Sequence, residues 1–154
     1  SIVVLGVTDK TVFLAARGLS PSQDEVLRAL PLFRERGETY AHSAELMDYL
    51  FRESPVMDEK AQKKFLVADK AGLLDAVAAR FAALAGFDEA TLESCFGALL
   101  AEGGLELKHL APPVRVALTG RTASPGLFEV AQLLGQQRTV ARLRAAAELA
   151  RGAG

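Results

Sequence analysis

Apolar side chains recur every three or four positions through most of the chain, which is the spacing of a buried face on an α-helix. The two clearest stripes consist of large apolar residues: Leu74, Val77 and Phe81 in the first, and Leu92, Phe96 and Leu99 in the second. Outside the first eight residues, the alternation typical of a β-strand is missing. The pattern therefore predicts an all-α fold in which these two stripes form a shared core.

Capping and stop signals set the helix boundaries. Asp58 and Asp88 each precede a helical stripe, where a carboxylate can accept a backbone N–H. The glycine pair at 103–104 ends one helix, and the proline pair at 112–113 is expected to interrupt the chain again. Helices are predicted at about 21–35, 40–52, 59–66, 70–85, 89–102, 125–134 and 136–150.

The composition changes near Asp58, and the chain contains no internal repeat or low-complexity linker. We therefore predict a first helical subdomain over 13–58 and a second, larger one over 59–154. The two are expected to pack as a continuous rod.

Charge is unevenly distributed along the 154 residues, although the net charge is only −1. Residues 1–110 carry 12 basic and 17 acidic side chains, a net charge of −5, whereas residues 111–154 carry six arginines and two glutamates, a net charge of +4. A basic end could hold a polyanion. An ordinary solvated basic helix would give the same pattern, so charge alone leaves both interpretations open.

Sequence motifs of the common catalytic sites are missing from the chain. It contains no GxxxxGK phosphate loop, no GxGxxG, no HExxH and no paired-cysteine metal site. His42 and His109 are the only imidazoles, and neither has a nucleophile beside it, so surface or capping roles are expected. Cys95 lies on an apolar stripe, where a packed, inert thiol is expected.

A single cysteine excludes a disulfide framework and favours a reducing compartment. The opening run IVVLGV is apolar for only about six residues and has no basic leader or cleavage site, so it predicts neither a signal peptide nor a membrane span.

Two features near the C-terminus could bind a ligand. Arg138 and Arg142 lie one helical turn apart, and we expect both to point into solvent, where they could meet phosphates. Ser124, Pro125 and Gly126 are expected to open a helix whose free backbone N–H groups could contact an anion or a base. Ser124 could equally be only an N-cap, with Pro125 in the first turn.

Several segments together resemble the C-terminal region of bacterial glutamyl-tRNA synthetases, over residues from about 22 to 150. The most specific is PPVRVALTGRTASPGLFEVAQLLGQQRTVARLR at 112–144. The others are LPLFRERGETY at 30–40, ESPVMDEKAQKKF at 53–65 and FDEATLESCFGALLAEGGLELKHLAPPVRVALTG at 87–120. Residues 1–12 do not match the family.

The resemblance implies an anticodon-binding portion made of two all-helical subdomains. The family's catalytic domain, with its HIGH-like and KMSKS-like motifs, is not in this chain. The implied partners are tRNA(Glu) and the catalytic domain of the same enzyme, with no membrane and no DNA. No cofactor is expected in this fragment, while the parent enzyme would use ATP and Mg²⁺ as a cytoplasmic monomer.

The resemblance also implies site residues. Arg36 matches the arginine that reads the third anticodon base, Arg115 matches one that contacts the anticodon from the second subdomain, and a base-reading loop contains Ser124, Pro125 and Leu127. The basic residues expected to hold the tRNA backbone are Arg34, Arg121, Arg138, Arg142, Lys60 and Lys64. Two other classes remain as alternatives: a helical protein–protein interaction module, and a small enzyme, which would need a catalytic constellation that the sequence lacks.

Overall fold

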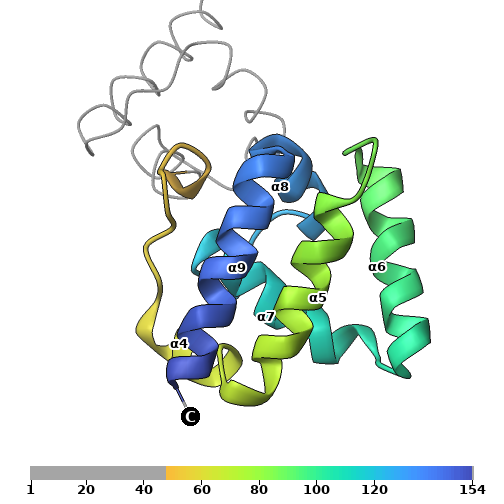
Figure 1. Cartoon of the computed structure of the whole chain (residues 1–154). Helices are drawn as coiled ribbons and strands as arrows, with labels where there is room; N and C mark the ends of the chain where they lie inside the picture. Colours follow the sequence, from red (N-terminus) through yellow and green to blue (C-terminus); the bar gives the residue numbers. More distant parts are fainter. Residues whose placement is uncertain (1–47, 154) are drawn as a thin grey trace, which may run out of the picture. The chain divides into compact units, whose positions relative to one another are not determined.

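The computed structural model describes residues 48–153, and these residues contain helices and turns but no strand, so the all-α prediction is confirmed there. The elements are the 3-10 helices η1 (Asp48–Leu50) and η2 (Ala68–Lys70) and the α-helices α4 (Glu59–Phe65), α5 (Ala71–Ala82), α6 (Glu89–Gly103), α7 (Leu107–Thr119), α8 (Leu127–Leu134) and α9 (Gln136–Gly152) (Figure 1). The helix predicted at 21–35 and most of the one at 40–52 lie outside the described residues.

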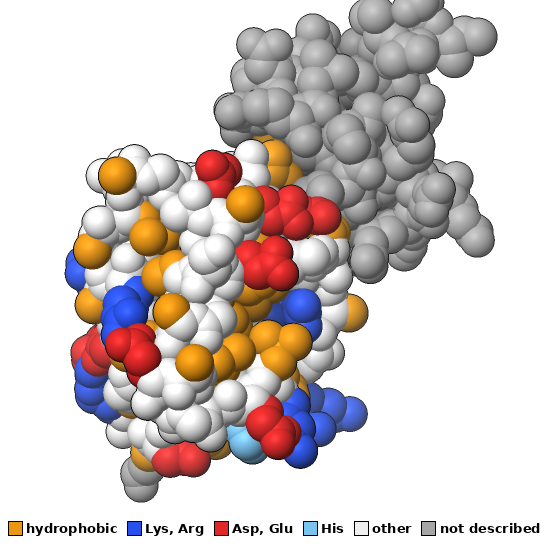
Figure 2. Space-filling model, turned by 90° about the vertical axis from the view of Figure 1, so that its right-hand side faces the viewer, with side chains coloured by type: hydrophobic (Ala, Val, Ile, Leu, Met, Phe, Trp, Pro, Cys, Tyr) orange, Lys and Arg blue, Asp and Glu red, His pale blue; other side chains and the backbone are white. Residues whose placement is uncertain are grey.

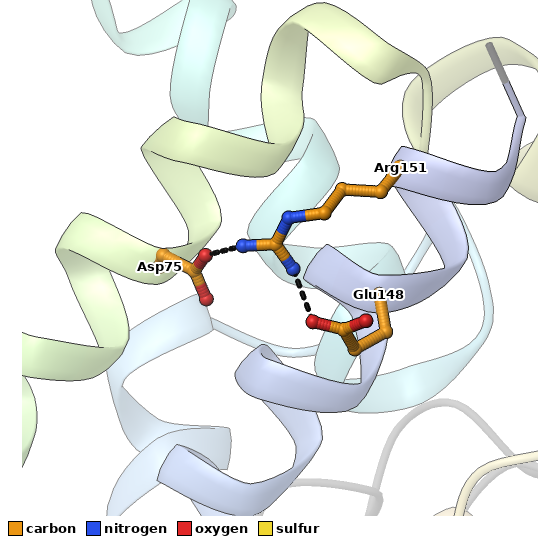
Figure 3. A network of polar contacts seen from close by, with 3 residues as sticks. All are labelled: Asp75, Glu148 and Arg151. Atoms are coloured by element: carbon orange, nitrogen blue, oxygen red, sulfur yellow. Dashed lines mark hydrogen bonds and ion pairs between the residues drawn. The ribbon is translucent and has the colours of Figure 1, made fainter.

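The chain divides into two compact units, Ser1–Glu53 and Ser54–Gly154. In the second unit, α5 packs most extensively against α9 and also contacts α6, so that α5 lies between them in Figure 1. The predicted core is confirmed, because the stripes that begin at Leu74 and Leu92 expose no more than 9% of any side chain. The C-terminal end of α9 is fixed to α5 by Arg151, which pairs with Asp75 and Glu148 (Figure 3).

Both predicted aspartate caps are present. Asp58 Oδ2 accepts the N–H of Ala61 at 3.0 Å, and Asp88 Oδ1 accepts the N–H of Thr91 at 2.7 Å. Hydrogen bonds from the Thr91 side chain and backbone lower the pKa of Asp88, because they favour the carboxylate over the neutral acid. The positions of α4 and α6 are thus set by the residues that the sequence indicated.

The helix α7 differs from the prediction, which places a break in the chain at the proline pair. Pro112 and Pro113 lie inside this helix. Proline has no N–H, so Pro113 leaves the carbonyl of His109 without its helical donor. Lys70 supplies a replacement, since its Nζ donates to that carbonyl at 3.0 Å. His109 also helps to start the helix, as its Nδ1 accepts the N–H of Glu106 at 3.1 Å, which fits the expected capping role.

Other boundaries shift by a few residues. The predicted 70–85 helix ends at Ala82, and the predicted 136–150 helix continues to Gly152. Among residues 48–153, no helix is both long enough and apolar enough to cross a bilayer.

Candidate functional site

The connection between α7 and α8, residues 120–126, contains most of the predicted base-reading residues. It begins at Gly120, whose φ of 76° is in the left-handed region that favours glycine. The carbonyl of Gly120 accepts the N–H of Asp58 at 2.8 Å. A Cβ added at Gly120 would lie 2.2 Å from the carbonyl oxygen of Val56. The start of this loop is therefore held in backbone contact with the segment that leads into α4.

Thr119, the last residue of α7, fixes the first turn of the loop. Its side chain is almost fully buried, with 1% exposed. The hydroxyl accepts the N–H of Arg121 at 3.1 Å and lies 2.8 Å from the carbonyl of Arg115, to which it can donate. Buried polar atoms are costly unless they are paired, so these contacts favour one conformation at the helix end.

The structure brings Arg115 and Ser124 together across the loop. Arg115 Nε donates to Ser124 Oγ at 3.0 Å, and that hydroxyl donates to the carbonyl of Pro125 at 2.8 Å. Pro125 and Leu127 are buried, whereas Thr122, which comes earlier in the loop, is exposed. The side chain of Arg115 therefore lies beside the predicted base-reading loop, and that loop is anchored at both ends.

The helix start proposed for this loop is wrong in detail. We expected a helix from residue 125 with Ser124 as its cap, but α8 begins at Leu127 and Gly126 precedes it without a side-chain cap. The Ser124 hydroxyl contacts Arg115 and the carbonyl of Pro125 instead. Arg115 lies nine positions earlier in the sequence and donates to this hydroxyl, which therefore does not cap α8.

Arg142 does not point into solvent as predicted. Only 4% of it is exposed, and its Nη1 donates to the carbonyl of Leu118 at 2.6 Å. Arg138 is half-buried, and its Nε donates to the carbonyl of Leu134, the last residue of α8, at 2.9 Å. The buried face of α9 is wider than its apolar stripe, because it contacts α5, α7 and α8. Both arginines therefore bind carbonyls at helix ends.

The other residues that were predicted to contact the tRNA backbone differ in how exposed they are. Lys60 and Lys64 are exposed on α4, and Arg121 is half-buried in the loop. Arg34 and Arg36 lie outside the described residues. On the face drawn in Figure 2, basic side chains occur in separate groups among acidic and apolar ones. That face of the described residues therefore carries no continuous basic patch.

A shallow hollow of about 630 Å³ lies between α5 and α6, away from this loop. Its lining includes Arg80 and Cys95. Burial raises the pKa of the Cys95 thiol, which disfavours the reactive thiolate. No group of potential metal ligands occurs among residues 48–153. The thiol is therefore half-buried in the lining of this hollow, and its raised pKa makes it less reactive than a free thiol.

Two structural contacts were not predicted from the sequence: Thr119, which fixes the first turn of the loop, and Lys70, which bonds to a carbonyl near the start of α7. Thr119 had a local signal, because a threonine before a glycine at a helix end can bond to neighbouring backbone groups. Lys70 had none, since its acceptor lies 39 positions away.

Comparison with known proteins places this geometry in a family context. Residues 10–147 match the family model described as an anticodon binding domain. The glutamate–tRNA ligase of Syntrophobacter fumaroxidans is 41% identical over 132 residues, which are 85% of this chain and 28% of that protein. The glutamate–tRNA ligase of Geobacter sulfurreducens is 38% identical over 135 residues, 87% of this chain and 29% of that protein.

A solved structure has the same fold. The crystal structure of a glutamate tRNA ligase from Elizabethkingia meningosepticum matches with a TM-score of 0.81 and 22% sequence identity, covering 94% of this chain and 28% of that one. The chain thus spans less than a third of the length of the ligases that it matches.

Proposed function

Because this chain belongs to the family of anticodon-binding domains, we propose that it is the part of a glutamate–tRNA ligase that recognises the anticodon of tRNA(Glu). The observation that carries this proposal is the family match over residues 10–147, together with ligase relatives of which the chain spans only 28% or 29%. The remainder of such a ligase would use ATP and Mg²⁺ to activate glutamate. None of these matches favours an interaction module that does not bind RNA.

The loop of residues 120–126 supports this function chemically. Single-stranded loop bases are recognised by hydrogen bonds to their edges and by stacking. A guanidinium has five N–H donors, and the hydrogen bond from Arg115 to Ser124 uses one of them. This bond orients the guanidinium and leaves its other donors for a base edge. The anchored backbone lowers the entropy cost of ordering the loop on binding.

Phosphates next to the bases need cations that are accessible. Lys60 and Lys64 are exposed on α4, whose first residues follow the segment bonded to Gly120. They can position the RNA without reading its sequence. Arg36 and Arg34 remain predicted contacts, with Arg36 expected to favour C over G at the third anticodon position. In a ligase that carries this chain, Arg36→Gln should narrow the preference for glutamate tRNA over glutamine tRNA.

The proposal can be tested by titrating the chain with tRNA(Glu) and with the same tRNA carrying a changed anticodon. The wild type is expected to bind the unchanged anticodon more tightly. Arg115→Ala should reduce that preference about tenfold, the scale of one lost bidentate contact. Arg144→Ala, a change of the same kind at an exposed position on α9, is the matched control and should leave the preference unchanged. Equal binding of both tRNAs by the wild type would overturn the proposal.

A further inference from the structure

Arg142 is charged, yet it lies almost completely inside the fold. It exposes 4% of its surface, whereas Arg144, two positions later on α9, is exposed. Burying a guanidinium is costly unless it is hydrogen-bonded. Its Nη1 donates such a bond to the carbonyl of Leu118 at 2.6 Å, and hydrogen bonds from a charged donor are shorter and stronger than neutral ones.

The acceptor of this bond is in the last turn of α7. The last four carbonyls of a helix have no intrahelical donor, and they form the negative end of the helix dipole. A guanidinium supplies both a donor and a positive charge there. Arg142 therefore stabilises the C-terminal end of α7 from a different helix.

That helix end is where the loop of residues 120–126 begins. Thr119 bonds to Arg121, and Gly120 bonds to Asp58, directly after the carbonyl that Arg142 holds. Arg115 is in the same last turns of α7, and its side chain reaches the other end of the loop at Ser124. A displacement of the α7 end would therefore move both the loop and Arg115.

We propose that Arg142 is a positioning residue for anticodon selection, which acts by fixing the end of α7 and not by contacting RNA phosphate. This inference rests on the proposed function. A phosphate contact and a positioning role differ in what they predict. Loss of a phosphate contact weakens binding to all sequences equally and lowers the salt slope by about 1 or slightly less. Loss of a positioning contact reduces selectivity and leaves the salt slope unchanged.

The test compares Arg142→Met with Thr139→Val in the complete chain. Thr139 is a matched control because it is also on α9, is 0% exposed, and donates from Oγ1 to a carbonyl of another helix, Ala131 in α8, at 3.2 Å. Each change removes a buried side-chain hydrogen bond to a helix carbonyl, and Arg142→Met also removes the charge and the other contacts of the guanidinium. Each variant is titrated with tRNA(Glu) and with the changed-anticodon tRNA at several salt concentrations, and amide exchange of residues 120–126 is measured.

In Arg142→Met, the preference for the unchanged anticodon is expected to fall about tenfold, while the salt slope of binding stays unchanged. The backbone amides of residues 120–126 should exchange faster than in the wild type. Thr139→Val should keep the preference. If Arg142→Met does not fold, Arg142→Lys replaces it, with a partial loss expected because a single ammonium retains the charge. Unchanged preference, or equal weakening for both tRNAs with a lower salt slope, would overturn the inference. Lack of preference in the wild type would instead overturn the proposed function.

Discussion

Replacing Phe81 with alanine gives the most direct test of the packing between α5, α6 and α9. Phe81 is 1% exposed, and its ring meets Phe87 edge to face, with centroids 5.9 Å apart. The backbone carbonyl of residue 81 accepts a hydrogen bond from Gln136, which the substitution leaves in place. The change is therefore confined to the buried ring.

The expected cost follows from the cavity that the ring leaves. Truncating a buried phenylalanine to alanine destabilises by about 3–5 kcal/mol. For the unit Ser54–Gly154, which has about 100 residues, that loss corresponds to a fall in Tm of about 14–24 °C. Calorimetry and urea titration of the wild type and Phe81→Ala measure both quantities.

Phe87→Ala is the control, because it removes the same ring pair from the half-buried side. Its cost should be smaller, about 1–2 kcal/mol. If the two variants lost equal stability, the aromatic contact and not the cavity would dominate. An unchanged unfolding midpoint for Phe81→Ala would refute the assignment of this ring to the core.

Three further predictions concern separate positions. Gly120→Ala should destabilise the chain, because φ is positive and a Cβ would lie 2.2 Å from the Val56 oxygen. Gly97→Ala, whose Cβ would have nothing within 4 Å, should instead stabilise α6 by about 0.5–1 kcal/mol. Thermal unfolding should show a lower Tm for the first variant and a higher Tm for the second. The pKa of Asp88 is lowered in the folded state, so its negative charge stabilises the fold fully above the unfolded pKa of about 3.9. This stabilisation is lost as the pH falls through the folded pKa. The difference in Tm between the wild type and Asp88→Asn should therefore be constant near neutral pH and change only below about pH 4. Cys95 should react with iodoacetamide at pH 8 more slowly than a small free thiol, since burial raises its pKa, and mass spectrometry of the time course checks this.

The parts of the fold that follow from local rules could be predicted from the sequence. The stripes containing Phe81 and Phe96 identify α5 and α6, and the caps at Asp58 and Asp88 place the starts of α4 and α6, because each signal lies within one or two helical turns. The matched order of motifs also identified the family that the comparison confirms.

Features that depend on distant residues could not be predicted in this way. Pro113 is tolerated inside α7 because Lys70, from another element, bonds to the carbonyl that the proline leaves free. Helical spacing gave the apolar stripe of α9 but not the width of its buried face, which includes Arg142. Ser124 was expected to cap a helix, yet it bonds to Arg115. In each case, a tertiary contact outweighs the local preference.

Part of the positive charge of the C-terminal segment, residues 111–154, is engaged in contacts within the fold. Its six arginines and two glutamates give a net charge of +4, but Arg142 and Arg138 bind helix-end carbonyls, and Arg151 pairs with two carboxylates. Charges that are already engaged within the fold release fewer counterions on binding RNA. Under the proposed function, net charge therefore overstates the number of phosphate contacts. Selectivity then depends on where the end of α7 places Arg115 and the loop after it, and this is the position that the buried guanidinium of Arg142 holds.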